Sequence, residues 1–124
     1  MAAIAELDIL IVDDHEGMRT LLRTVLTRAG ATLVRQAGSG AEALALLAER
    51  PAALILADQM MPEMDGIAFT GHARANGSDA RIIMITGRVE PRFAEAATAA
   101  GVNAVLLKPV SPRALIEAIE RAFA

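Results

Sequence analysis

Residues 53–66 have the sequence ALILADQMMPEMDG, and the apolar run that opens this stretch indicates the fold of the chain. The run Ala53–Ala57 contains no polar side chain, whereas a strand with one face in water alternates apolar and polar side chains. A short run without alternation is typical of a strand in a parallel sheet that is covered on both faces. Asp58, which follows the run, then lies at the carboxyl end of this strand.

Four similar runs lie on either side of this one along the chain. The five runs are Ile9–Val12, Thr32–Ala37, Ala53–Ala57, Arg81–Ile85 and Ala104–Leu107. Helical patterns separate them, and the clearest, Glu16–Ala29, has apolar residues on one face and arginines and threonines on the other. Because strand and helix alternate five times, we predict an α/β fold, a doubly wound, five-stranded parallel sheet with helices on both faces.

Local signals mark the ends of the predicted helices. Gly30 and Gly101 are helix stops. Ser39 and Glu42 form an S-x-x-E capping box at the start of the second helix. The third helix contains Gly71, which lowers its helix propensity. After the first helix, the predicted helices run from Ser39 to Pro51, from just after Asp65, from Pro91 to Ala100, and from Ser111 to near the end of the chain.

Composition excludes several classes of protein. The chain has no cysteine, which excludes disulfide scaffolds, thiolate zinc sites and thiol catalysis. Apolar stretches such as Ala52–Ala57 are far shorter than the roughly 18 residues of a membrane-spanning helix. A net charge of −3 and the absence of Trp and Tyr argue against binding to nucleic acid.

The length of 124 residues fits one domain over residues 1–124. A charged-then-apolar leader is absent, so we expect a cytoplasmic protein that binds neither membrane nor nucleic acid.

Polar residues follow four of the five predicted strands, where ligands bind in parallel sheets. They are Asp13 and Asp14, then Asp58, then Thr86, then Lys108 with Pro109, and Lys108 is the only lysine of the chain. Two unit charges about 4 Å apart repel by roughly 4 kcal/mol at an effective dielectric of about 20, so three crowded carboxylates favour a bound hard cation such as Mg²⁺. Nucleophile, cation and donors together are what a transferring phosphoryl group needs.

Each of these residues has a simpler interpretation when it is considered alone. An isolated aspartate at a strand end is usually a helix cap, which is how Asp14 or Asp65 would be interpreted. Capping does not explain the whole set at the ends of four strands. We expect His15 and His72 to be solvated surface residues. Three methionines are expected to pack in their loop rather than bind a soft metal, namely Met60, Met61 and Met64.

These motifs, in this order, resemble the receiver domains of response regulators, the CheY-like family. The matching pieces are Asp13-Asp14, the D-x-x-M-P-x-M-D-G stretch from Asp58 to Gly66, Thr86-Gly87 and Lys108-Pro109. The D-x-x-M-P-x-M-D-G stretch is specific by itself, and the resemblance covers nearly the whole chain. It implies a flavodoxin-like (βα)5 fold with strand order 2-1-3-4-5 in a bacterial two-component or phosphorelay system.

The resemblance also implies roles for the carboxylates. Asp58 would be the phosphoacceptor, attacking a phosphohistidine on a sensor histidine kinase or a histidine phosphotransfer protein. Asp13, Asp14 and Asp58 would bind Mg²⁺, with Mn²⁺ as a substitute, and the backbone carbonyl of Met60 would complete the protein ligands.

The remaining motif residues would bind the phosphoryl group and respond to it. Thr86 would hydrogen-bond a phosphoryl oxygen, next to Gly87 in a flexible loop. Lys108 would pair with Asp58 and then with the phosphoryl group. Pro109 would follow a cis peptide bond that directs Lys108 into the site.

Three further positions are expected to tune the response. Met60 and Arg88, two residues past Asp58 and Thr86, occupy places that in the family tune loss of the phosphoryl group. Val105 stands where the fifth strand often carries an aromatic residue that turns inward with the threonine, so coupling through a rotating ring is not expected here.

We therefore expect a stand-alone signalling receiver without an effector domain. It would be no enzyme on a separate substrate, although it would phosphorylate and slowly dephosphorylate itself. Its output would be altered contact with an unknown downstream protein, through the fourth helix, fifth strand and fifth helix, and the first helix would dock the phosphoryl donor. The protein would be a monomer or a weak, phosphorylation-dependent dimer.

Three other functions agree less well with the sequence. Phosphohydrolases of the haloacid dehalogenase type have a D-x-D motif after the first strand, and the sequence Asp13-Asp14-His15 lacks that spacing. A pseudo-receiver that binds partners without phosphorylation would not need Asp58, Thr86 and Lys108 together. A flavodoxin needs a Ser/Thr/Gly-rich phosphate loop after the first strand and a Trp or Tyr beside its flavin, which the chain lacks.

Overall fold

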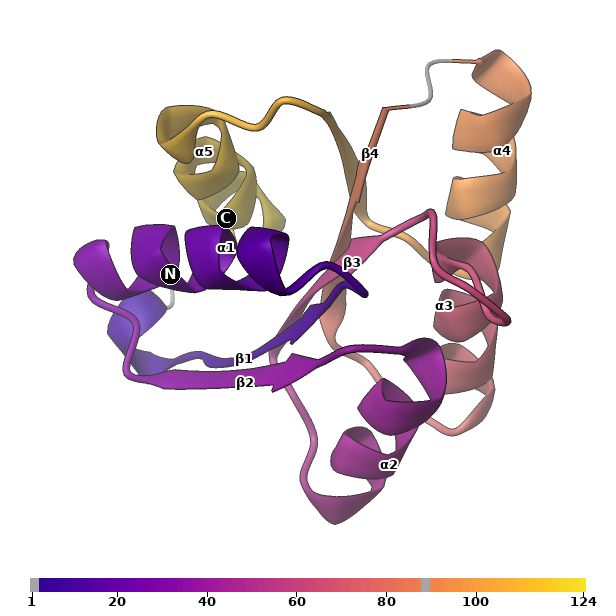
Figure 1. Cartoon of the computed structure of the whole chain (residues 1–124), viewed down its shortest axis with the longest axis horizontal. Helices are drawn as coiled ribbons and strands as arrows, with labels where there is room; N and C mark the ends of the chain where they lie inside the picture. Colours follow the sequence, from indigo (N-terminus) through magenta and orange to yellow (C-terminus); the bar gives the residue numbers. More distant parts are fainter. Residues whose placement is uncertain (1–2, 88–89) are drawn as a thin grey trace.

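The five strands form one parallel sheet in the order β2-β1-β3-β4-β5, which confirms the predicted fold. The computed structural model describes residues 3–87 and 90–124 (Figure 1). The strands are β1 (Asp8–Val12), β2 (Leu33–Ala37), β3 (Leu54–Asp58), β4 (Arg81–Thr86) and β5 (Ala104–Leu107). The helices are α1 (Glu16–Arg28), α2 (Gly40–Glu49), α3 (Gly66–Ala75), α4 (Pro91–Ala100) and α5 (Pro112–Ala122), and a 3-10 turn (Ile4–Glu6) precedes β1.

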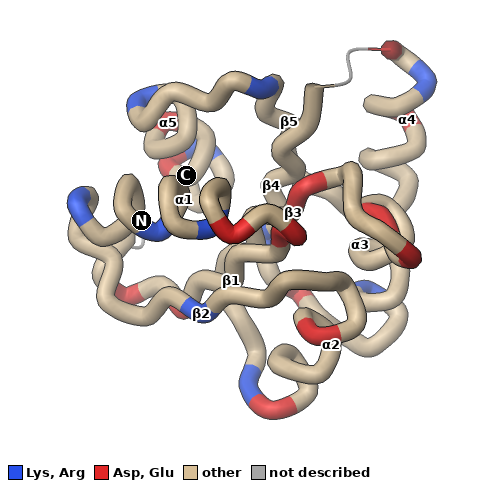
Figure 2. Tube along the Cα trace, viewed as in Figure 1, with Lys and Arg blue, Asp and Glu red and all other residues tan. Residues whose placement is uncertain are grey.

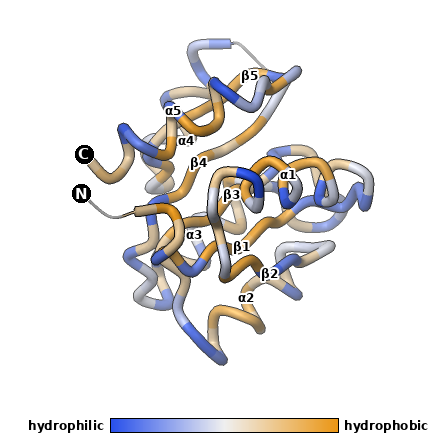
Figure 3. Tube along the Cα trace, turned by 90° about the vertical axis from the view of Figure 1, so that its left-hand side faces the viewer, coloured by the Kyte–Doolittle hydropathy of each residue, from blue (hydrophilic) through white to orange (hydrophobic). Residues whose placement is uncertain are grey.

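Helices cover both faces of the sheet, α1 and α5 on one side and α2, α3 and α4 on the other (Figure 1). Successive side chains of a strand point to opposite faces. In β1, Ile9 and Ile11 pack with the α1 and α5 layer, whereas Leu10 and Val12 pack with the other helices. All four side chains are fully buried, which explains why the run is apolar without alternation. The central strands are accordingly hydrophobic along their length (Figure 3).

The two edge strands differ from the three central ones. β1, β3 and β4 are buried nearly throughout, whereas β2 and β5 have exposed positions. On β5, Val105 is 37% exposed and Leu107 is 51% exposed. An edge strand has a neighbour on one side only, so the apolar pattern of this run overstated its burial.

The helix starts follow the predicted capping signals. Ser39, Asp65 and Ser111 are the N-cap residues of α2, α3 and α5, and each side chain accepts a hydrogen bond from a backbone N–H in the first turn. The end of α2 differs from the prediction, because the helix stops at Glu49 and Arg50 is extended. Proline disfavours helical backbone in the residue before it, and Pro51 follows Arg50.

Strands β3 and β4 each extend one residue further than the predicted runs, which end at Ala57 and Ile85. Asp58 pairs with Ile85, and Thr86 pairs with Leu107, so both polar residues are the last residues of their strands. Their side chains are therefore held by the sheet itself rather than by the loops that follow.

Across residues 3–87 and 90–124, the helices lack the length and apolar character needed to traverse a bilayer.

Candidate functional site

Acidic residues lie at the carboxyl edge of the sheet, where β1 and β3 end side by side (Figure 2). Asp13 and Asp14 follow β1, and Asp58 ends β3. Ligand atoms from Asp13, Asp14, His15 and Asp58 all lie within 4.8 Å of one another. The sheet topology therefore brings together the three carboxylates expected from the sequence, and adds a histidine to them.

Asp58 is the most buried member of this cluster. Its side chain is 1% exposed, and Lys108 Nζ lies 3.1 Å from its Oδ1 atom. That contact is an ion pair without hydrogen-bond alignment, so among the described residues neither carboxylate oxygen of Asp58 has a hydrogen-bond partner. The charge of Lys108 offsets part of the cost of burying this carboxylate, but no aligned hydrogen bond from the described part of the chain replaces the water that folding removes from it. The surroundings of Asp58 are therefore incomplete, and a bound cation or phosphoryl group would complete them.

The donor set fits a hard divalent cation. Oxygen atoms of Asp13, Asp14 and Asp58 lie within 4.8 Å of one another, and Mg²⁺ in proteins is commonly held by one or two carboxylates while it keeps several waters. The partnerless oxygens of Asp58 are the observation that supports this fit. When bound, the ion would offset the repulsion among the three charges.

Asp13 is held at the site by contacts on both its backbone and its side chain. Its carboxylate Oδ1 accepts a hydrogen bond of 2.8 Å from the backbone N–H of His15, and its carbonyl accepts one of 2.6 Å from Arg19 Nη1. Burial raises the pKa of Asp13 above its usual value, and the charge of Asp58 raises it further. The hydrogen bonds from His15 and the charge of Lys108 act in the opposite direction. The pKa of Asp13 is therefore raised in part by the negative charge that it faces in the cluster.

Two residues of this site were not recognised in the sequence. His15 was expected to be a solvated surface residue, and its side chain is indeed 68% exposed, but Nδ1 lies 3.1 Å from Asp14 Oδ1 and 3.3 Å from Asp13 Oδ1. Arg19 was assigned to the outer face of its helix, yet its guanidinium reaches back to the Asp13 carbonyl. The signal for both is position, since His15 follows the aspartate pair directly and Arg19 lies one helical turn further on.

Gly66 allows the loop after β3 to fold back on the end of the strand. Its N–H donates to the Gln59 carbonyl (3.0 Å), and Gln59 Oε1 accepts from the Ile67 N–H (2.9 Å). A Cβ atom at Gly66 would lie 2.6 Å from the Asp58 carbonyl oxygen and 3.0 Å from Gln59 Cα. These neighbours are backbone atoms and cannot move aside cheaply, so the glycine that ends the D-x-x-M-P-x-M-D-G stretch has a steric role.

Gly66→Ala should therefore destabilise the protein, by about 1–3 kcal/mol as for other overpacked sites. The matched control is Gly71→Ala in the same helix, where a Cβ atom meets nothing within 4 Å. This control should raise stability by about 0.5–1 kcal/mol, because alanine has the better helix propensity. Urea denaturation of the two variants measures both effects, and equal stability of the two would contradict the steric role of Gly66.

Thr86 and Lys108 connect the cluster to the other half of the sheet. Thr86 is fully buried, and its backbone carbonyl accepts a hydrogen bond of 2.8 Å from the Lys108 N–H. The Lys108–Pro109 peptide bond is cis. Gly87 is exposed at the end of β4.

Two of the three expected tuning positions are among the described residues. Met60 is exposed in the loop after β3, and Val105 is partly exposed on β5, away from the sheet interior. Arg88 lies outside the described residues. The three loop methionines were expected to pack, and Met61 packs in the core and Met64 against it, but the exposed Met60 does not follow this expectation.

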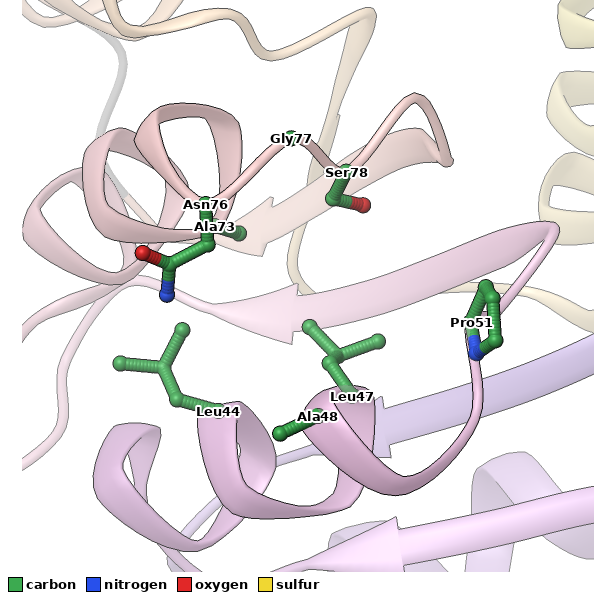
Figure 4. Close-up of a pocket in the computed structure, with 8 residues that line it drawn as sticks. All are labelled: Leu44, Leu47, Ala48, Pro51, Ala73, Asn76, Gly77 and Ser78. Carbon is green, nitrogen blue, oxygen red and sulfur yellow. The ribbon is translucent and has the colours of Figure 1, made fainter.

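A separate cavity of about 430 Å³ lies between α2 and α3 (Figure 4). Leu44 and Leu47 line one side of it, and Ala73, Asn76 and Gly77 line the other. These helix ends lead into β3 and β4, so the cavity is at the amino edge of the sheet and distant from the acidic cluster.

Comparisons with known proteins identify the family. The chain matches the response regulator receiver domain over residues 9–120. It is 34% identical to the probable chemotaxis protein CheY of Rhizobium etli, across 99% of this chain and 97% of that protein. It is also 34% identical to the chemotaxis protein CheY of Bacillus subtilis, across 91% of this chain and 94% of that protein.

The solved structures agree with this result. Chemotaxis protein CheY4 of Vibrio cholerae superimposes with a TM-score of 0.87 at 30% identity, covering 92% of this chain and 96% of that one. The chain therefore belongs to the response regulator receiver domain family, the CheY-like phosphoacceptor domains of two-component signalling, whose members typically bind Mg²⁺.

Proposed function

We propose that Asp58 accepts a phosphoryl group from a phosphohistidine in a Mg²⁺-dependent reaction. The observation that supports this best is the Asp58 carboxylate itself, buried, without hydrogen-bond donors among the described residues, and 3.1 Å from Lys108 Nζ. An aspartate in this position is a nucleophile that lacks only a cation and an electrophile. The donor would be a sensor histidine kinase or a histidine phosphotransfer protein.

The transfer step follows from these residues. An Asp58 oxygen forms a bond to phosphorus as the bond from phosphorus to the donor's histidine nitrogen breaks, and the electron pair of that bond stays on the imidazole. Asp13, Asp14 and Asp58, with the Met60 backbone carbonyl, would hold Mg²⁺, which would neutralise charge on the phosphoryl oxygens. Mn²⁺ would serve in its place.

Lys108 and Thr86 would then hold the product. The Lys108 ammonium, already beside Asp58, would pair with a phosphoryl oxygen, a strong charge-assisted hydrogen bond. The Thr86 hydroxyl would donate to another oxygen, with Gly87 leaving the following loop room to move. Because the Thr86 carbonyl accepts from the Lys108 N–H, a shift of either residue is passed on to the other.

The output would be a changed protein surface rather than turnover of a substrate. On this proposal, a downstream protein reads α4, β5 and α5, where Val105 and Leu107 are exposed, and the phosphoryl donor docks on α1. The protein would act in the cytoplasm as a monomer or as a weak dimer formed on phosphorylation. It would lose the phosphoryl group slowly by its own hydrolysis.

Intact-mass spectrometry after incubation with acetyl phosphate tests this function. With Mg²⁺ the chain should gain the mass of one phosphoryl group, the added group should be labile to base, and excess chelator should prevent the gain. A chain that stays unmodified with Mg²⁺, or gains as much mass in chelator, would rule the proposal out.

The crowded carboxylates should weaken the metal-free fold, and Asp13→Asn should strengthen it. Asparagine can still accept the hydrogen bond from His15 but removes one of three charges. The folded-state pKa of Asp13 is raised above the unfolded value, so the cost is absent below the unfolded pKa and develops as pH rises through the folded pKa. The gain in unfolding free energy should therefore be present at pH 7 and disappear as the pH falls toward about 4.

Thermal melts with and without millimolar Mg²⁺ complete this test. Mg²⁺ should raise the Tm of the wild type, because it binds the folded state, and should raise that of Asp13→Asn much less. Identical wild-type melts in Mg²⁺ and in chelator would argue against a cation site at these residues.

A further inference from the structure

We propose that His15 is a nitrogen ligand that makes the acidic site bind Ni²⁺, Co²⁺ or Zn²⁺ more tightly than Mg²⁺. This inference rests on the cation site of the proposed function and adds to it the class of metal that the site selects. It gives a role to the His15 imidazole, which has none in the proposed phosphoryl transfer.

The position of the imidazole fits a shared metal ion. Nδ1 of His15 lies 3.1 Å from Asp14 Oδ1 and 3.3 Å from Asp13 Oδ1. Metal–ligand bonds of about 2.1 Å place neighbouring ligand atoms about 3.0 Å apart in an octahedron and about 3.4 Å apart in a tetrahedron. The nitrogen therefore lies from each of the two oxygens at a distance that two ligand atoms of one ion can have.

Asp58 supplies the independent sign that this cluster receives a ligand. Its side chain is almost completely buried, and neither oxygen has a hydrogen-bond partner among the described residues. Its ligand atom lies within 4.8 Å of those of Asp13, Asp14 and His15. The set therefore offers three carboxylates and one imidazole to the same ion.

The ligand preference of each ion then determines whether His15 increases its binding affinity. Mg²⁺ prefers oxygen ligands and keeps several of its waters, so an imidazole adds little to its binding. Imidazole nitrogen suits Zn²⁺ and Ni²⁺, and affinity at mixed nitrogen and oxygen sites rises along the first-row series toward nickel and copper. His15 thus strengthens binding of the later metals selectively.

The backbone fixes His15 at the mouth of the site while leaving its ring accessible. Its N–H donates to Asp13 Oδ1, and its carbonyl accepts from the Arg19 N–H. The Arg19 guanidinium donates in turn to the Asp13 carbonyl, which closes this turn of the chain. The ring itself remains 68% exposed, so an ion can reach it from solvent and displace the contacts between Nδ1 and the carboxylates.

Calorimetric titration of the untagged, chelator-treated full chain at pH 8 tests this selectivity, since a polyhistidine tag would itself bind nickel. The wild type should bind Ni²⁺ more tightly than Mg²⁺. His15→Ala should lose at least about tenfold in Ni²⁺ affinity, as when a supporting group of a metal site is removed, and change little toward Mg²⁺. His72→Ala, at an exposed position on α3, should match the wild type for both ions.

Pulsed electron paramagnetic resonance of bound Co²⁺ gives a second readout that does not depend on affinity. The wild type should show coupling to a directly bound ¹⁴N nucleus, and His15→Ala should lose it. Equal Ni²⁺ affinity in the wild type and His15→Ala, or bound Co²⁺ without nitrogen coupling, would mean that His15 is not a ligand of the later metals and would overturn the inference.

These outcomes are separable from failure of the proposed function. A chain that is phosphorylated with Mg²⁺ but binds Ni²⁺ equally with and without His15 contradicts this inference alone. A chain that takes up no phosphoryl group with Mg²⁺ contradicts the proposed function, whatever its affinity for nickel.

Discussion

Asp58→Asn should abolish phosphorylation, with no mass gain after acetyl phosphate and Mg²⁺ under conditions that modify the wild type fully. The amide has almost the same size as the carboxylate, so the packing at the end of β3 should survive. It carries no negative charge, however, and is a very poor nucleophile toward phosphorus. Because it also removes a buried charge without a hydrogen-bond partner, the variant should fold at least as stably as the wild type in the absence of metal.

The matched control is Asp79→Asn, at an exposed aspartate between α3 and β4. This variant loses the same charge from the chain but should gain one phosphoryl group at the wild-type rate. Circular dichroism of both variants separates loss of the nucleophile from loss of the fold. If Asp58→Asn is modified as fully as the wild type, another residue is the nucleophile.

The fold was predictable because the central strands are apolar without alternation, which is a pattern visible in the sequence. The run at β3 is apolar on both faces, and Ile9 to Val12 of β1 repeat this pattern, since two helical layers cover the central strands. The starts of α2 and α3 were predictable because a single N-cap side chain, Ser39 or Asp65, identifies each of them. The burial of the edge strand β5 was not predictable, since it depends on which strands have a neighbour on only one side.

The candidate site was predictable as a list of residues but not as a set of contacts. Asp58 ends its strand, Asp13 and Lys108 directly follow theirs, and a parallel sheet brings those ends to one edge. The ring orientation of His15 and the reach of Arg19 to a backbone carbonyl depend on side-chain rotamers, which no sequence period encodes. Arg19 has the spacing of an ordinary surface position on an amphipathic helix, and His15 lies just before that helix begins.

Thr86→Ala should leave phosphorylation of Asp58 intact but remove most of the conformational response. Thr86 is fully buried at the end of β4, and its carbonyl is bonded to the Lys108 N–H. On the proposed function its hydroxyl donates to a phosphoryl oxygen, and a hydrogen bond to a charged group is worth about 1.5–3 kcal/mol. Loss of that bond should shift the equilibrium between inactive and active forms by roughly ten- to a hundredfold.

Two further variants separate the hydroxyl from packing. Thr86→Ser keeps the hydroxyl and should restore most of the response. Val105→Ala trims a partly exposed side chain on the neighbouring strand β5 and should leave the response nearly intact, because no aromatic ring at this position has to turn inward.

Amide NMR shifts across residues 91–107, with and without the phosphoryl mimic beryllofluoride, measure this response. Thr86→Ala should show small shift changes in α4 and β5, whereas the wild type, Thr86→Ser and Val105→Ala should show large ones. Intact-mass spectrometry on the same samples checks that acetyl phosphate still modifies each variant. If Val105→Ala blocks the shifts and Thr86→Ala does not, then β5 packing, rather than the Thr86 hydroxyl, carries the signal from Asp58 to the surface.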